Sequence, residues 1–327
     1  MEILVADIGG TNARFAIASM RGGDISLTHV QKLRVDDYPD FPAALRTYHT
    51  DIPHTKLHHA VLALASPIVD DKAELTNGNW QFDAIEIATM LNCPAATLLN
   101  DFVAIGHAVA RCGSDELLHY AGPKAQEDAG YPILVVGPGT GLGVSIVIGS
   151  GAGYDVIETE GGHIGFSPSS PSQTKLLDHF LASHDRVSVE RVASGPALRE
   201  ISNCLFPEEI AVWRDMDDAA LWNLALKEAD SPPGKALDEF CAILGAAIGD
   251  IALATGVKKV VLAGNIANKI SEMSSNQPFI TGFHNKGRFK GLMEQLPVML
   301  LTETDSGLQG AAAYYFGKPT SATRAPA

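Results

Sequence analysis

The sequence predicts an α/β protein with two related halves. Apolar segments of strand length alternate along the chain with segments that have the apolar spacing of helices. Two of the predicted strand pairs flank a glycine-rich turn. The first pair, Ile3 to Ala18, contains DIGGTN, and the second, Ile133 to Ile148, contains GPGTGLG. This weak internal repeat indicates two related α/β units.

The alignment of the two turns and the chain length both favour two domains. When the turns are aligned on their glycines, Gly9 falls on Gly139 and Thr11 falls on Gly141. The chain has 327 residues, of which 46% are hydrophobic and 19% are charged. A chain of this size and composition is typical of a soluble enzyme with more than one core.

In the first half, strands are followed by helices. Periodicity and turn residues predict the following elements: a strand at His59 to Val69, a helix at Phe82 to Leu91 with Ile85, Ala88, Met90 and Leu91 on its apolar face, a strand at Ala96 to Asn100, and a helix at Asp101 to Arg111. Either Asn100 or Asp101 could cap the last of these helices.

The second half follows a loop-rich stretch, Ser114 to Gly130, which is a plausible domain boundary. The predicted elements are helices at Gln173 to Ser183, Asp217 to Ala229 and Ala236 to Thr255, a strand at Val257 to Ala267 ending in a glycine turn, a strand at Val298 to Thr302, and a helix at Ser306 to Phe316. The small, polar segment Lys318 to Ala327 is predicted to be a frayed tail.

Charge and cysteine usage exclude several classes of protein. The formal net charge of −14 repels nucleic acid and anionic lipid, and no apolar run reaches the roughly eighteen residues of a membrane span. Met1 to Val5 contain no basic region, so we expect no signal peptide. The four cysteines form no CxxC pair. We therefore expect a cytoplasmic protein with no nucleic-acid or membrane partner.

The first glycine turn has the composition of a phosphate-binding loop. Its glycines allow a ligand to approach the backbone, whose N–H groups can bind an anion. Thr11 and Asn12 add side-chain donors, Arg14 adds a positive charge, and Asp7 could hold a metal ion through water. A bare glycine pair would more often be a tight hairpin, but this combination favours a function.

The second turn, Gly137 to Gly143, has four glycines in seven residues and suits the wrapping of phosphate oxygens. It is not GxxxxGK[ST], because no Lys-Ser or Lys-Thr follows, and it is not a dinucleotide fingerprint, because a strand and not a helix follows it. Alone it could equally be structural. Paired with the first turn, it suggests two loops that grip one polyphosphate.

Polar side chains elsewhere could bind and activate a polyol. Asn100 and Asp101 lie at a strand-to-helix junction, where a carboxylate can act as a general base, although a helix cap is the more common explanation. Glu160 and His163 in the EGGH segment could bond adjacent hydroxyls, or His163 could be a half-buried histidine with a structural role. Glu190 could equally be a surface charge.

Together these residues resemble the bacterial glucokinase family, within the actin, hexokinase and Hsp70 superfamily. The resembling segments span nearly the whole chain in the family's order: VADIGGTNARFAIA from Val5, LTNGNWQFD at Leu75 to Asp83, LLNDFVAIGHAV at Leu98 to Val109, GPGTGLG, EGGH, VERVASGP at Val189 to Pro196, NKGRF at Asn285 to Phe289, and SGLQGAA. Each motif is weak, but the combination is specific.

The resemblance implies a fold and a reaction. It implies two actin-like, ribonuclease H-like α/β domains of unequal size that flank a substrate cleft. The small domain would hold residues 1–110 and about 303–320, and the large domain residues 111–302. The implied reaction is transfer of the γ-phosphate of ATP to the 6-hydroxyl of glucose, with Mg²⁺ bridging the β- and γ-phosphates. A homodimer is also implied.

The resemblance also implies residue roles. Asp101 looks like the catalytic base. The sugar ligands would be Asn100, Asp101, Glu160, His163 and Glu190. The ATP-binding residues would be Ala6, Asp7, Ile8, Gly9, Gly10, Thr11, Asn12, Gly139, Thr140, Gly141, Gly143, Gly264 and Asn265. In the adenosine turn the family usually has two consecutive glycines, and here the second is Asn265, which tolerates left-handed dihedrals better than most residues.

Four alternatives stay open at this point. The chain could phosphorylate another hexose on the same fold. A zinc-containing branch of sugar kinases, ROK, needs a cysteine cluster soon after the glycine-histidine pair, and Ile164 to Lys175 contains none, so we expect no zinc. A non-catalytic sugar-responsive regulator would need a DNA-binding module ahead of Asp7. An actin-like ATPase that grips protein would not need the sugar-binding residues.

Overall fold

The computed structural model describes residues 1–52, 56–75, 79–113, 115–124, 130–150, 153–303 and 305–317. Contacts divide the chain into two compact units, which are described separately here. Unit 1 consists of Met1–Cys112, Asp155–Glu158 and Glu303–Ala327, and unit 2 consists of Gly113–Tyr154 and Thr159–Thr302. The predicted tail, Lys318 to Ala327, lies outside the described residues, as do residues 76–78 of the LTNGNWQFD segment.

Unit 1 is built on a mixed sheet. In the described residues this sheet has five strands in the order β3-β2-β1-β4-β7. They are β1 (Glu2–Ile8), β2 (Asn12–Arg21), β3 (Asp24–Arg34), β4 (Leu57–Leu64) and β7 (Ala96–Asn100). The first three strands are antiparallel neighbours, whereas β4 runs parallel to both β1 and β7. A short hairpin of β5 (Lys72–Glu74) and β6 (Gln81–Asp83) stands apart from the sheet.

The register of the parallel strands determines which residues share an edge of this sheet. Ile8 lies opposite Leu64, and Leu64 lies opposite Asn100. Since parallel strands end at the same edge, the turn that follows Ile8 and the helix that follows Asn100 both leave the sheet at its carboxyl edge. This is the edge at which α/β sheets commonly bind ligands.

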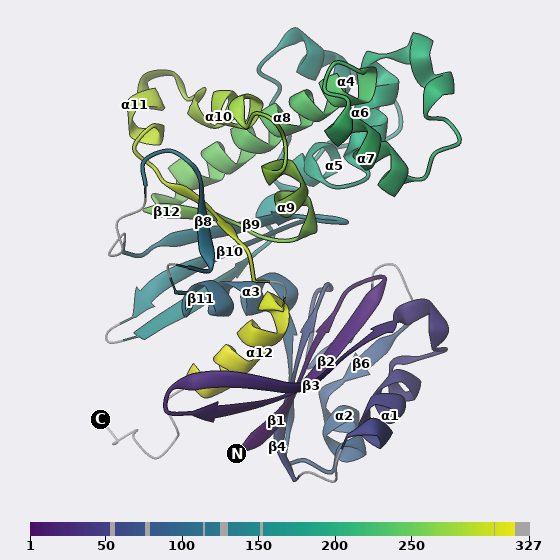
Figure 1. Cartoon of the computed structure of the whole chain (residues 1–327), viewed down its shortest axis with the longest axis vertical. Coiled ribbons are helices and arrows are strands. Elements are labelled where there is room, and N and C mark those ends of the chain that lie inside the picture. The colour runs from purple at the N-terminus through teal and green to yellow at the C-terminus, as the bar shows by residue number, and fades with distance from the viewer. Residues whose placement is uncertain are drawn as a thin grey trace. The chain divides into compact units, whose positions relative to one another are not determined.

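Helices cover both faces of the unit 1 sheet (Figure 1). On one face, α1 (Phe41–Asp51) and α2 (Ala84–Met90) bury Phe41, Tyr48 and Ile87 against the strands. On the other face, α3 (Asp101–Val109) and α12 (Ser306–Gly317) pack against the sheet and against each other. Burial on both faces explains why β1 and β4 are almost continuously apolar.

Two details of the predicted first half were wrong. The strand predicted at His59 to Val69 ends at Leu64, because the chain turns into the β5–β6 hairpin. In α2 the buried positions are Ala84 and Ile87, with Leu91 one turn further, whereas Ile85 is 77% exposed. Spacings of three and four residues define the buried face of a helix, and Ile85 does not share that spacing.

Unit 2 has a longer mixed sheet. In the part of the chain that is described, its strand order is β11-β10-β9-β12-β13-β8. The bounds are β8 (Leu117–Ala121), β9 (Ile133–Pro138), β10 (Leu142–Ser150), β11 (Gly153–Thr159), β12 (Lys259–Leu262) and β13 (Val298–Leu301). The edge strand β8 lies inside the stretch Ser114 to Gly130 that was predicted to be loop-rich, so that prediction was wrong for these five residues.

Helices of unit 2 pack around α8 (Pro232–Thr255), whose Phe240, Leu244 and Ile248 are buried in the same core as Val136 and Leu262 of the sheet (Figure 1). The other helices are α4 (Pro171–Leu181), α5 (Val189–Ala193), α6 (Ala197–Leu205), α7 (Asp218–Lys227), α9 (Asn265–Ser271), α10 (Gln277–His284) and α11 (Lys290–Met293). None of the helices in the described ranges has the length and apolar character needed to cross a membrane.

Candidate functional site

The first glycine turn joins β1 to β2 at the carboxyl edge of the unit 1 sheet. The Gly9 N–H donates to the Asn12 carbonyl at 3.0 Å and closes the turn. A Cβ atom added at Gly9 would meet no other atom within 4 Å, and Gly10 and Thr11 are exposed. The backbone of this turn is therefore open to a ligand.

Asp7 lies just before this turn and is tightly surrounded. It pairs in register with Arg14 on β2, whose Nη1 donates to Asp7 Oδ2 at 3.0 Å. At the start of α12, a Cβ atom on Gly307 would lie 2.6 Å from Asp7 Cγ, so only glycine fits there. Burial raises the pKa of Asp7, Arg14 opposes that shift, and the Asp305 carboxylate adds to it.

Asn100 and Asp101 lie at the junction of β7 and α3. The Asn100 Oδ1 accepts hydrogen bonds from the N–H groups of Phe102 at 2.8 Å and Val103 at 3.2 Å. Asn100 is therefore the helix cap, which decides between the two candidates from the sequence. Asp101 is the first residue of the helix, where the positive end of the helix dipole favours a carboxylate.

Three polar side chains of unit 2 converge. Glu160 immediately precedes a 3₁₀ turn, η2 (Gly161–His163). The Nε2 of His163 lies 3.8 Å from Glu160 Oε2 and 3.9 Å from Glu190 Oε1. Of the alternatives left open for Glu190, the structure disfavours a plain surface charge, because its side chain is only 31% exposed and its Oε2 accepts from the Leu142 N–H at 3.0 Å.

The second glycine turn joins β9 to β10 in unit 2. Within it, the Gly139 N–H donates to the Gly141 carbonyl at 2.8 Å. A Cβ atom at Gly139 would again meet nothing within 4 Å. On its other side the turn is supported by the segment after α5, because the Gly195 N–H donates to the Gly139 carbonyl at 2.7 Å. This turn, too, offers open backbone.

The predicted adenosine turn lies beside the second glycine turn. The Ala263 N–H donates to the Val136 carbonyl, and a Cβ atom on Gly264 would lie 3.8 Å from the Pro138 carbonyl oxygen. Gly264 has φ 90° and ψ 171°, a conformation that is essentially restricted to glycine. Asn265 is the first residue of α9. The expectation that Asn265 needs a left-handed conformation, in a strand continuing to Ala267, was therefore wrong.

The structure thus brings the predicted residues together in two groups. The carboxyl edge of unit 1 holds Ala6 to Asn12 together with Asn100 and Asp101. In unit 2, Gly264 and Asn265 lie next to the second glycine turn, which contains Gly139 to Gly143. The cluster of Glu160, His163 and Glu190 lies beside that turn as well. Sequence reasoning assigned no role to Gly307 or Gly195. Both lie in segments that resembled the family, SGLQGAA and VERVASGP, but their contacts are with residues far away in the sequence.

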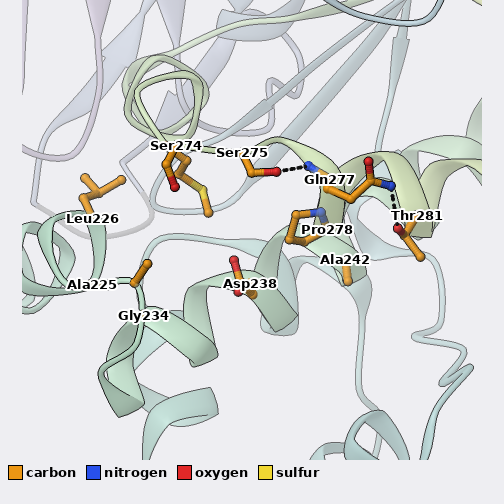
Figure 2. A pocket seen from close by; sticks show the side chains of 12 residues that line it. Ala225, Leu226, Gly234, Asp238, Ala242, Ser274, Ser275, Gln277, Pro278 and Thr281 are labelled. Atoms are coloured by element: carbon orange, nitrogen blue, oxygen red, sulfur yellow. Dashed lines mark hydrogen bonds between the residues drawn. The ribbon is translucent and has the colours of Figure 1, made fainter.

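A separate pocket of about 440 Å³ lies in unit 2 between α7, α8 and α10 (Figure 2). The Asp238 side chain projects toward it from α8, with Ser274 and Ser275 opposite and Pro278 at its side. None of the predicted site residues is among the described residues that line it. Likewise, the described residues include no group of three or more His, Cys, Asp or Glu side chains that could hold a metal ion.

Comparisons with known proteins agree on one family. The Glucokinase family model matches residues 4–317. A glucokinase from Zymomonas mobilis is 37% identical over 97% of this chain and 98% of its own length. The crystal structure of a glucokinase from an Antarctic psychrotroph is 31% identical, with a TM-score of 0.78 over 97% of this chain and 99% of that one.

A more distant relative shares the fold. The crystal structure of a glucokinase from Balamuthia mandrillaris in complex with glucose superimposes with a TM-score of 0.80 over 96% of this chain and 92% of that one, at 20% identity. At this identity the likeness shows the fold alone. It indicates that both units, and not only the motifs, follow the architecture of these structures.

Proposed function

This chain belongs to the glucokinase family and phosphorylates glucose with ATP, and we propose that Asp101 is the base that takes the proton from the 6-hydroxyl of the sugar. The observation that carries the proposal is the register of the unit 1 sheet. Because Ile8 and Asn100 end parallel strands at one edge, an open glycine turn and the Asn100–Asp101 junction emerge together. Phosphoryl transfer requires that the phosphate donor and the attacking hydroxyl are held close together, and two binding groups at one sheet edge can do this.

The proposed ATP site uses both glycine turns. The open space beside Gly9 and Gly139 supports a close approach of phosphate oxygens to the backbone N–H groups. Thr11 and Thr140 are exposed and can add hydroxyl donors. Gly264 and Asn265, next to the second turn, would contact the adenosine. The two units would then be the small and large domains, with boundaries near residues 110 and 303.

The residues at the first turn fit a magnesium ion bound through water and substrate phosphates. They do not form the cage of side chains that would hold a metal ion by protein groups alone. Mg²⁺ keeps several waters and binds through one or two carboxylates plus substrate phosphates, so it needs no cage of side chains. Asp7, at the first turn, is the carboxylate that would reach it through water. When bound with ATP, Mg²⁺ would neutralise charge on the phosphates. We propose that zinc plays no part in the reaction.

The residues proposed to bind glucose are Asn100 and Asp101 in unit 1, and Glu160, His163 and Glu190 in unit 2. Since Asn100 Oδ1 is occupied by the helix cap, its amide Nδ2 is the group that would donate to a sugar oxygen. Carboxylates and an imidazole accept from or donate to neighbouring hydroxyls. Asp101 at the start of α3 can accept the proton as the hydroxyl oxygen attacks phosphorus.

The decisive variant is Asp101→Asn, which keeps the size of the side chain but removes the base. We expect kcat to fall by about 10²- to 10⁴-fold while glucose still binds. A coupled assay gives kcat, and isothermal titration gives glucose affinity. Wild-type turnover by this variant would remove Asp101 from the mechanism. The same assay with glucose, mannose, fructose, glucosamine and N-acetylmannosamine should give the highest kcat/KM for glucose.

Two further expectations concern the whole protein. A cytoplasmic location, expected from the charge and the N-terminal residues, and assembly as a homodimer, implied by the family resemblance, both stay predictions. Size-exclusion chromatography with light scattering measures the mass in solution directly. A monomeric mass at working concentration would contradict the homodimer without bearing on the catalytic proposal.

A further inference from the structure

Glu190 differs from the other proposed sugar ligands because its two carboxylate oxygens face different parts of unit 2. Oε1 lies 3.9 Å from Nε2 of His163, within the polar cluster proposed to bind glucose. Oε2 accepts a hydrogen bond of 3.0 Å from the N–H of Leu142, the residue that ends the second glycine turn and begins β10. One carboxylate therefore contacts both the sugar cluster and the turn.

The contact with the turn is close and partly buried. Leu142 is 4% exposed, and a Cβ atom on Gly141 would lie 2.5 Å from Glu190 Oε2. A buried N–H without an acceptor is costly, so the Leu142 N–H favours the conformation in which Glu190 reaches it. The turn is thus held in place by a side chain that does not belong to it.

The helix that carries Glu190 supports the turn at both ends. Glu190 lies in α5 and bonds to Leu142, after the turn, while Gly195, just beyond α5, bonds to the Gly139 carbonyl at the start of the turn. The Gly195 carbonyl in turn accepts from Trp222 Nε1 at 3.0 Å. These bonds form a brace, consisting of Val189 to Gly195, along the second glycine turn.

Building on the sites proposed above for ATP and glucose, we infer that Glu190 is a positioning residue that couples them: its carboxylate holds the phosphate-binding turn while it binds the sugar. A glucose molecule that fixes Oε1 restricts the same carboxylate whose Oε2 fixes Leu142. Glucose then preorganises the turn, and ATP binds more tightly. By thermodynamic reciprocity, ATP strengthens glucose binding by the same factor.

The test separates the hydrogen bond from the charge. Glu190→Gln removes the negative charge near the phosphates but keeps an oxygen that can accept from Leu142, whereas Glu190→Ala removes both. His163→Ala is the matched control, since His163 belongs to the sugar cluster and its side-chain contacts in the described residues are with Glu160 and Glu190, not with the turn. Each protein is titrated with a non-hydrolysable ATP analogue and Mg²⁺ in the absence of sugar.

Without sugar, Glu190→Gln should bind the analogue at least as tightly as wild type, and His163→Ala as tightly as wild type. Glu190→Ala should bind it roughly five- to thirtyfold more weakly than Glu190→Gln, because an unbraced turn spends less time in the competent conformation. Equal affinities of the Ala and Gln variants would overturn the role of Glu190 in holding the turn.

Hydrogen exchange at the Leu142 amide gives a second readout that needs no ligand. Protection should fall in Glu190→Ala and persist in Glu190→Gln, and equal protection in both would again overturn the inference. If Glu190→Ala is less stable overall, exchange at the Val260 amide in the core reports that global loss. A larger loss of protection at Leu142 than at Val260 then shows the local effect on the turn.

The coupling itself is measured by repeating the titrations at saturating glucose. Glucose should raise the affinity of wild type for the analogue about fivefold or more, and this gain should vanish in Glu190→Ala. Glucose that binds wild type but leaves the analogue affinity unchanged would overturn the coupling and leave the proposed function intact. Failure of wild type to bind or phosphorylate glucose would instead overturn the proposed function.

Discussion

The two glycine turns have the same local architecture but different supports. Each connects two antiparallel strands, with Gly9 and Gly139 as the first residue after the first strand. The first turn is supported by its own hairpin, through the ion pair of Asp7 and Arg14. The second turn has no carboxylate of its own, and its support comes from α5, through Glu190.

This difference shows that a repeated element can be supported in two different ways. In the first turn, the charged group is part of the strand, so the chemistry is encoded within a few consecutive residues. In the second turn, the backbone is bare and the charged group comes from a segment about fifty residues away. Substitutions in the first turn should therefore act locally, whereas the second turn should respond to distant changes.

Among changes at the two turns, the largest expected effect comes from Asp7→Asn. Loss of the carboxylate proposed to hold the metal through water should lower kcat by roughly a hundredfold, as for other preorganised electrostatic groups. Stability should change in the opposite sense. Burial raises the pKa of Asp7, so the protonated form favours folding and the group's contribution to stability falls as pH rises through that raised pKa.

Thermal unfolding between pH 4 and pH 8 measures how the stability of Asp7→Asn relative to wild type changes with pH. The Tm of Asp7→Asn relative to wild type should rise with pH, because only wild type must bury a charge there. Arg14 is 36% exposed and can be solvated when it loses its partner. We propose that Asp7 lowers the stability of the protein when it is charged and that it serves catalysis. A variant less stable than wild type at pH 8, or as active as wild type, would contradict this.

The next largest expected effects are those of Glu160→Gln and His163→Ala, in the cluster beside the second turn. Each removes a proposed bond to a sugar hydroxyl and should weaken glucose binding about ten- to a hundredfold. Their affinity for an ATP analogue should stay at the wild-type value. Isothermal titration with each ligand separately measures both. Unchanged glucose affinity would mean that these side chains are structural and that the sugar binds elsewhere.

A smaller expected effect, on the free energy of unfolding, distinguishes Gly307 from Gly139. A side chain at Gly307 would press against other atoms, whereas a side chain at Gly139 would face open space. Gly307→Ala would press a methyl group against Asp7 and should lower the free energy of unfolding by about 1–3 kcal/mol. Gly139→Ala faces open space and should change it by less than about 0.5 kcal/mol, while it weakens binding of the ATP analogue. Denaturant titration ranks the two, and a reversed order would refute the assignment.

The smallest expected effect is that of removing zinc. Elemental analysis of the purified protein should find no stoichiometric zinc, and a zinc-selective chelator should leave the rate unchanged in excess Mg²⁺. Omission of Mg²⁺ should abolish activity. About one zinc per chain would move the protein to the other branch of sugar kinases, and a rate lost to the chelator would implicate zinc in unit 2.

Local signals in the sequence were enough to predict the strands around both turns and the junction at Asn100. Strands β1, β2, β9 and β10 contain apolar stretches on either side of the glycine turns, and Asn100 has the chemistry of a cap. The family match then confirms the α/β fold and the glucokinase reaction. The individual site residues remain predictions.

What the sequence could not predict depends on contacts over long distances. Strand β8 is only five residues long and partly exposed, and it becomes a strand because it pairs with β13, which is far along the chain. The backbone of Gly264 takes up the unusual dihedral that was expected of Asn265, and only the start of α9 reveals this. The bond from Leu142 to Glu190 leaves no local pattern, so the role of Glu190 could not be read from VSVERVASGP.

Helix α12 has a consequence for the order in which the protein is made. Leu308, Ala311 and Ala312 of this helix complete the unit 1 core on the face that also buries Ile3 and Val5. A ribosome synthesises nearly all of unit 2 between these two parts of the same core. Unit 2 can therefore finish folding on the nascent chain while the earlier strands have no covering helix, and their apolar face on that side of the sheet stays uncovered by α12 until the helix emerges.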